Sequence, residues 1–124
     1  MAGLAGYQKV CDSERVIDGG KGFRFAIYWE NAYVPAFIVR YEKSVYGYLN
    51  RCAHQAIELD WNEGEFFDVD KRFLVCATHG ALYEPVEGKC ISGRCQGIGL
   101  TRLLVKETEN EIFVASDYVV KVKK

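Results

Sequence analysis

Two short boxes, each with one cysteine and one histidine, are the residues of this sequence best suited to do chemistry. The first is Cys52-Ala53-His54 and the second is Cys76-Ala77-Thr78-His79, so each box offers one thiolate and one imidazole. These groups are common protein ligands of zinc and of iron–sulfur centres. The chain has only 2 histidines, and both lie in the boxes. The spacing therefore predicts one metal centre with the ligands Cys52, His54, Cys76 and His79.

The mixed composition of each box separates the possible centres. Zinc sites more often show a C-x₂-C pair and an H-x₃₋₅-H pair. A [2Fe–2S] cluster needs four ligands from two facing loops, and two mixed boxes allow one iron to take both sulfurs and the other both nitrogens. Gly80, directly after His79, and the glycines up to Gly99 also favour the iron–sulfur interpretation. Structural zinc and histidines packed in an ordinary core are the alternatives.

The paired C-x-H and C-x₂-H-G boxes resemble the ligand loops of Rieske proteins. In that family two cysteines bind one iron of a [2Fe–2S] cluster and two histidines bind the other. The resemblance therefore implies one such cluster on Cys52, His54, Cys76 and His79. Tyr83 stands where many Rieske proteins have an aromatic residue. The stretch 88–93 resembles the turn that closes the second loop, although Arg94 stands where that turn usually has a proline.

Two departures from the respiratory members show which part of the family this chain resembles. Respiratory Rieske proteins have one further cysteine in each box, and these form a disulfide, whereas this chain has Ile57 and Thr78 in the corresponding regions. They also have a serine that donates to a bridging sulfide, and Ala81 takes its place here. A missing donor lowers the expected potential. These features resemble the ferredoxins that supply bacterial oxygenases.

The composition indicates a soluble globular protein. The chain has 124 residues, 49% hydrophobic and 27% charged, which fits a single domain over residues 1–124. A formal net charge of −1 argues against binding to nucleic acid or to an anionic membrane. No stretch is long and apolar enough to span a bilayer, and the N-terminus does not resemble a signal peptide. We therefore expect a cytoplasmic protein without membrane contact.

The pattern of apolar residues predicts an all-β fold. Expected strands cover 23–29, 35–41, 45–49, 100–107 and 111–115, with short ones at 66–67 and 73–75. Hairpin turns are expected at 42–44 and 108–110. No segment has a sustained helical period, so we expect little helix. The resemblance implies a Rieske-type antiparallel β-sandwich, with a cluster lobe inserted at about residues 49–99.

The other cysteines and several aromatic and acidic residues have plain structural interpretations. We expect Cys11 to be a small core residue, and Cys90 and Cys95 to be thiols rather than a disulfide, because cytosolic disulfides are rare. Trp61, Phe66 and Phe67 are expected in the core of a hairpin rather than on a docking surface. Glu58 and Asp60, near the first box, are expected to be solvated.

The resemblance implies a soluble one-electron carrier between a flavin-dependent reductase and a terminal oxygenase or reductase. The chain is not expected to be an enzyme, because an oxygenase iron site needs two further histidines and a carboxylate, and no third histidine is present. It also has no glycine-rich nucleotide fingerprint. The alternatives are an accessory small subunit of a multi-component reductase, similar to those of nitrite reductases, and a redox sensor. A monomer is favoured.

Overall fold

A strand that is apolar on both faces runs through the centre of the molecule. In this computed structural model, which describes residues 6–29, 32–51, 59–60, 64–76, 80–93, 99–115 and 120–122, it is β3 (Ala32–Tyr41). Its residues 36–39 are all fully buried. Successive side chains of a strand point to opposite faces. Four consecutive buried residues therefore mean that both faces of β3 are covered.

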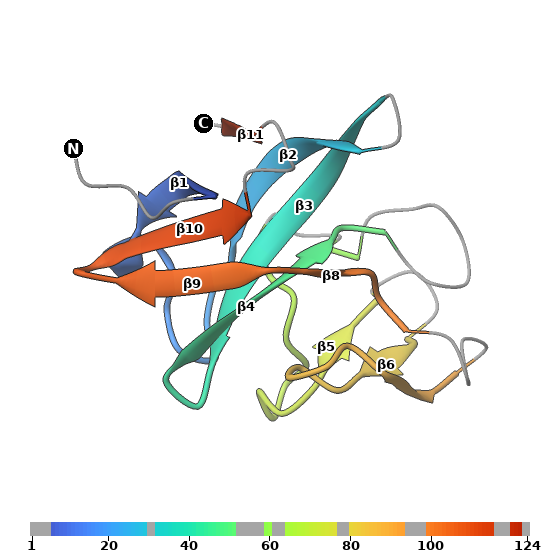
Figure 1. Cartoon of the computed structure of the whole chain (residues 1–124). Helices are drawn as coiled ribbons and strands as arrows, with labels where there is room; N and C mark the ends of the chain where they lie inside the picture. Colours follow the sequence, from blue (N-terminus) through green and yellow to red (C-terminus); the bar gives the residue numbers. More distant parts are fainter. Residues whose placement is uncertain are drawn as a thin grey trace.

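Two antiparallel sheets form the base of the molecule. One contains β3, and the other covers the first face of β3. One has the order β11-β2-β3-β4-β8 and the other β1-β10-β9 (Figure 1). Their strands are β1 (Tyr7–Asp12), β2 (Phe23–Trp29), β4 (Ser44–Leu49), β8 (Arg102–Leu103), β9 (Val105–Thr108), β10 (Glu111–Ala115) and β11 (Val120–Val122). Between them lies an apolar core of Val10, Cys11, Val16, Phe23, Phe25, Ile27, Ala36, Ile38, Leu49, Leu103, Ile112 and Val114.

The second face of β3 is covered by a smaller lobe inserted between β4 and β8. Its sheet has the order β5-β6-β7, formed by β5 (Leu74–Val75), β6 (Leu82–Tyr83) and β7 (Cys90–Ser92). A second core joins this lobe to the base through Phe37, Val39, Tyr48, Leu59, Phe66, Leu74, Cys76, Ala81, Tyr83 and Leu100. The all-β architecture with an inserted lobe is therefore confirmed.

Two tight turns fix the long hairpins. The β3–β4 turn is formed by Glu42 and Lys43, and the β9–β10 turn by Glu109 and Asn110. All four have positive φ, between 48° and 75°. Two-residue loops with positive φ at both positions match the twist of the flanking strands. The sequence predicts both turns correctly, each one residue too long.

The sequence predicts the longer strands of the base better than the short and edge strands. The expected strands at 23–29 and 111–115 coincide with β2 and β10, and the segment 100–107 is divided into β8 and β9. The sequence analysis missed β1, β6, β7 and β11, which are short or carry exposed polar residues. The described residues contain one helical turn, η1 (Ser13–Arg15), and no described helix could cross a bilayer.

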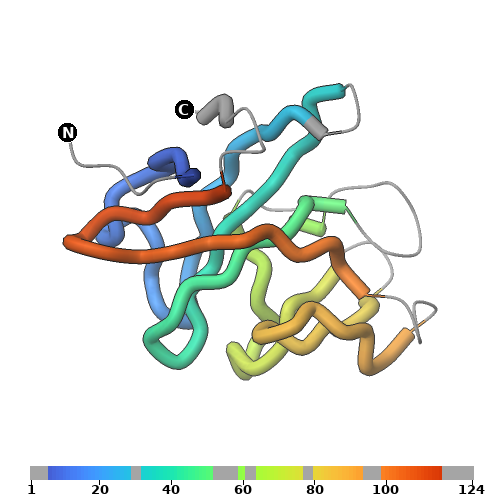
Figure 2. Tube along the Cα trace, viewed as in Figure 1, coloured from blue at the N-terminus to red at the C-terminus, as the bar shows by residue number. Residues whose placement is uncertain are grey.

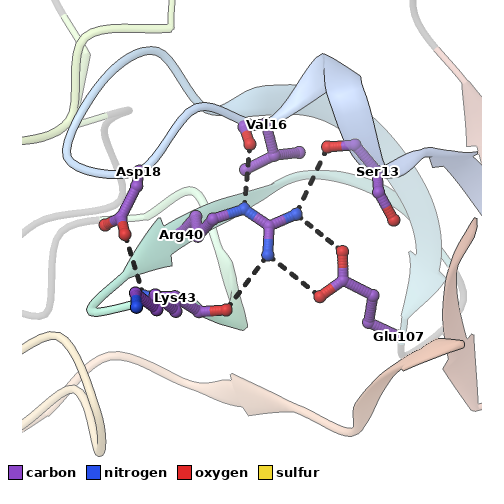
Figure 3. Close-up of polar contacts among 6 residues, drawn as sticks. All are labelled: Ser13, Val16, Asp18, Arg40, Lys43 and Glu107. Carbon is purple, nitrogen blue, oxygen red and sulfur yellow. Dashed lines mark hydrogen bonds and ion pairs between the residues drawn. The ribbon is translucent and has the colours of Figure 1, made fainter. Parts of the chain in front are cut away.

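Arg40 holds together three segments of the base that are far apart in the sequence (Figure 3). Its Nε donates to Val16 O at 3.0 Å, and its Nη2 contacts Glu107 Oε2 on β9 at 2.6 Å. Nη1 donates to Glu107 Oε1 at 2.9 Å and to Lys43 O at 3.2 Å. The guanidinium lowers the pKa of Glu107 below its usual range through these bonds. The ion pair therefore stabilises the base by joining β3 to β9.

Candidate metal centre

Cys76 is the one predicted ligand that lies within the described residues. Its side chain is fully buried in the second core. Its backbone N–H donates to Ala81 O at 2.9 Å, and its carbonyl accepts from Gly80 N–H at 2.8 Å. Gly80 has a φ of +73°, which glycine adopts without strain. These bonds bring Gly80 and Ala81 back beside Cys76, between the end of β5 and the start of β6.

The other three predicted ligands, Cys52, His54 and His79, lie outside the described residues. The structure therefore describes the candidate centre through Cys76 and through the segments that flank both boxes. Thiolate is the form of cysteine that binds metals, and Cys76 offers its sulfur where β5 ends and the second box begins. Cys11 is the contrasting case, since it is a buried cysteine of the base core. Burial there raises its pKa to about 11, which keeps the thiol protonated.

A closed turn at residues 84–88 follows β6 and bonds to the segment before β8. The Glu84 carboxylate accepts from the N–H groups of Val86 and Glu87, at 2.8 and 2.7 Å. Gly88 N–H donates to Glu84 O at 2.8 Å, and Gly88 O accepts from Leu100 N–H at 2.8 Å. These bonds connect the end of the lobe back to the base next to β8.

A row of three side chains on neighbouring strands attaches the lobe to the base. Arg24, Phe37 and Tyr48 are partners in the registers of β2, β3 and β4, and they point to the lobe face of the sheet. Arg24 Nε lies 2.9 Å from Asp60 Oδ2. Phe37 stacks on Phe66 with ring centroids 3.9 Å apart, and the Tyr48 hydroxyl donates to the carbonyl of Pro85 at 2.5 Å. Burial raises the pKa of this hydroxyl.

Each member of this row contacts a different part of the lobe. The three contacted segments are residues 59–60, which follow the first box, residue 66, and residues 84–88, which follow the second box. Figure 2 shows the lobe, drawn in yellow-green to yellow-orange, lying beside the β3–β4 hairpin. The segments that follow the two boxes are therefore attached to the same sheet.

Several structural expectations are tested by these contacts. Cys11 and Phe66 are core residues as predicted, and Phe67 is partly buried against the second core. Asp60 is only 6% exposed, so the expectation that it is solvated was wrong. Cys90 is disulfide-bonded, so the expectation of a thiol was wrong for this residue. Trp61, Glu58 and Cys95 lie outside the described residues.

The sequence reasoning missed Arg24, which pairs with Asp60, and Asn50, whose side chain donates a hydrogen bond to Asp60. A signal for Arg24 was present, because an arginine between Phe23 and Phe25 must point away from their core. What lies on that opposite face could not be derived from the strand itself. Asn50 has no comparable signal, since asparagine after a strand is ordinary for a loop.

Comparisons with known proteins agree on one family. Residues 6–107 match the family model described as Rieske [2Fe-2S] domain. No curated protein matches significantly. The ferredoxin of carbazole 1,9a-dioxygenase from Nocardioides aromaticivorans IC177 has a similar structure, with 21% identity, a TM-score of 0.67, and coverage of 88% of this chain and 96% of that chain.

Two further solved structures are similar over most of their length. The ferredoxin of Sphingomonas yanoikuyae B1 is 19% identical with a TM-score of 0.67, over 87% of this chain and 96% of that chain. A chain from a complex of reduced oxygenase and oxidized ferredoxin in carbazole 1,9a-dioxygenase is 21% identical. Its TM-score is 0.68, and 98% of this chain and 99% of that chain are covered. At these identities the structures establish a shared fold.

Proposed function

The chain belongs to the family of Rieske [2Fe–2S] domains and is an electron-transfer protein, and we propose that it passes single electrons from a flavin-dependent reductase to a terminal oxygenase. Its cofactor is one [2Fe–2S] cluster, for which we propose the ligands Cys52, His54, Cys76 and His79. When bound, the cluster supplies one-electron redox chemistry at a higher potential than a cluster with four cysteine ligands.

The turn that begins at Cys76 is the observation that supports this ligand set most directly. The Cys76 side chain is fully buried, and two backbone hydrogen bonds beside it bring the chain back to β6. The apolar residues around it, including Ala81 and Tyr83, exclude water from the sulfur. The buried sulfur lies where β5 ends and the second box begins, which suits a ligand of the cluster.

The choice of an oxygenase as acceptor is supported by the similar ferredoxins. Two of the similar structures come from carbazole 1,9a-dioxygenase systems, and one of these is a complex of oxygenase and ferredoxin. The chain has no histidine beyond His54 and His79, so the proposal assigns oxygen activation to a separate partner. We further propose that the carrier is monomeric and acts in the cytoplasm, where both partners would meet it.

The ligand set is tested by replacing two buried cysteines. Wild-type protein is expected to contain about two iron atoms and two acid-labile sulfides per chain. Cys76→Ala should abolish the visible spectrum, because a cluster with four protein ligands tolerates a vacancy poorly. Cys11→Ala is the matched control and should retain the full iron and sulfide content. One zinc and no sulfide in the wild type, after growth with ample iron, would refute the proposal.

The carrier role is tested by anaerobic reduction. The pure protein is mixed with NADH, and its visible spectrum is followed with and without a flavin-dependent reductase. We expect bleaching only with the reductase, because no nucleotide fingerprint is present in the sequence. Rapid bleaching by NADH alone would contradict the proposed role.

A further inference from the structure

Two buried polar side chains join the ends of the segment that contains the first box. Asn50 is 2% exposed and Asp60 is 6% exposed, and residues 52–58 lie between them in the sequence. Asn50 Nδ2 donates to Asp60 Oδ1 at 2.9 Å, and Asn50 Oδ1 accepts from Leu59 N–H at 2.8 Å. Asn50 N–H donates to Pro35 O of β3 at 2.8 Å. Side-chain hydrogen bonds therefore close this segment at its base.

The Asp60 carboxylate is held from two further directions. Its Oδ2 accepts from Gly64 N–H at 2.9 Å and lies 2.9 Å from Arg24 Nε. The Asp60 side chain is 0% exposed and the Arg24 side chain 18% exposed. A buried carboxylate is stable only when its charge is paired and its oxygens are hydrogen-bonded. Here both conditions are met, and the counter-ion comes from the central sheet.

These contacts differ from ordinary core packing because they hold the two ends of the segment that contains the first box. Asn50 directly follows β4, and Asp60 lies after the first box. Their hydrogen bond joins these two segments, and the ion pair of Asp60 with Arg24 joins both to β2. A loop whose two ends are fixed to one sheet loses less conformational freedom when it binds a ligand, which favours binding. Ligands that are pre-oriented by supporting hydrogen bonds also bind metals more tightly.

We propose that Asn50 and Asp60 are positioning residues for the first ligand box, with Arg24 as the counter-ion of Asp60. They fix the ends of the segment that contains Cys52 and His54 against the five-stranded sheet, to which the segment after the second box is also attached. Neither side chain is a ligand. The inference rests on the proposed ligand set. It states that residues other than the four ligands help to hold the cluster.

The test uses Asp60→Asn, which keeps the shape of the side chain and removes its charge. The new amide nitrogen must face a donor, either Asn50 Nδ2 or Gly64 N–H, so at least one bond is lost. Holoprotein is incubated with an iron chelator, and the loss of visible absorbance is timed. We expect loss to be about tenfold faster or more, since a hydrogen bond to a charged group contributes about 1.5–3 kcal/mol. We also expect altered g-values in the EPR spectrum of the reduced protein.

Glu107→Gln is the matched control, because it removes the carboxylate of another partly buried arginine pair, on β9 of the base. It should change neither the rate of loss nor the EPR spectrum. If Asp60→Asn is not soluble, Asn50→Ala is measured in the same way. If Asp60→Asn and Asn50→Ala behave like Glu107→Gln in both measurements, the inference is overturned while the ligand proposal still stands. A wild type without iron and sulfide would overturn the ligand proposal and the inference together.

Discussion

Gly88 is the position where the closing turn of the lobe touches the base most closely, and Gly88→Ala tests that contact. Gly88 has a φ of +79°, and a Cβ there would lie 2.7 Å from Tyr48 Cε1 and 3.3 Å from its Cδ1 and Cζ. The Tyr48 ring cannot move aside easily, because it is fully buried and its hydroxyl is bonded to the Pro85 carbonyl. The substitution therefore adds both backbone strain and a steric clash.

The two contributions can be estimated separately. A left-handed conformation costs a residue with a Cβ roughly 1–2 kcal/mol, and forcing an extra methyl group into a packed core costs roughly 1–3 kcal/mol. Together they should reduce the free energy of unfolding by about 2–5 kcal/mol. For a domain of this size, that corresponds to a fall in melting temperature of roughly 8–19 °C.

Gly19→Ala is the control for the backbone contribution. Gly19 has a φ of +67°, but the atom nearest to an added Cβ is Lys71 Cβ at 3.5 Å, an ordinary contact. Melting of both variants is followed by circular dichroism on protein with the same iron content. Gly19→Ala should lose only about 5 °C. Equal losses for the two variants would refute the claimed contact, as would an unchanged cost of Gly88→Ala in a Tyr48→Leu background.

The remaining predictions concern hydrogen bonding, electrostatics and the potential. Tyr48→Phe should lower the free energy of unfolding by about 1–3 kcal/mol, measured by thermal melting, because Pro85 O loses its buried donor. Arg40 lowers the pKa of Glu107 below its ordinary value of 4.5, so the pair adds stability above pH 4.5 that is lost as the pH falls below it. The loss of melting temperature in Glu107→Gln should therefore be larger at about pH 7 than at about pH 4, and an effect independent of pH would contradict this. The reduction potential should lie at about −150 to 0 mV, and Ala81→Ser should raise it in voltammetry by adding a hydroxyl donor. A wild-type value above about +200 mV would be inconsistent with this reasoning.

The parts of the fold that follow from local chemistry were predictable from the sequence. The runs at 23–29 and 111–115 are rich in aromatic and β-branched residues, and both are strands. The two-residue turns needed positive φ, which Asn110 tolerates well. The family was recognisable because two mixed cysteine–histidine boxes are typical of Rieske proteins, and residues 6–107 match that family. The ligand set itself stays a prediction.

The parts that depend on contacts between distant segments were not predictable. The sequence indicates that Arg24 points away from Phe23 and Phe25, but the carboxylate that meets it is Asp60, 36 positions later. The sequence analysis therefore treated Asp60 as a solvated charge. The edge strand β1 was also missed. Its residues Gln8 and Lys9 are polar and exposed, so Val10 and Cys11 alone do not give a recognisable apolar strand pattern.

The row formed by Arg24, Phe37 and Tyr48 also shows what another sandwich would need in order to receive the lobe. It would need at least a cation for Asp60, a flat ring for Phe66 and a hydroxyl for Pro85 on three adjacent strands, together with an apolar residue such as Val39 for the second core. The tip of the lobe is not under this constraint, because Val69 is 94% exposed in the turn after Asp68. Length can therefore change at that tip, by insertion or deletion, without altering how the lobe is seated.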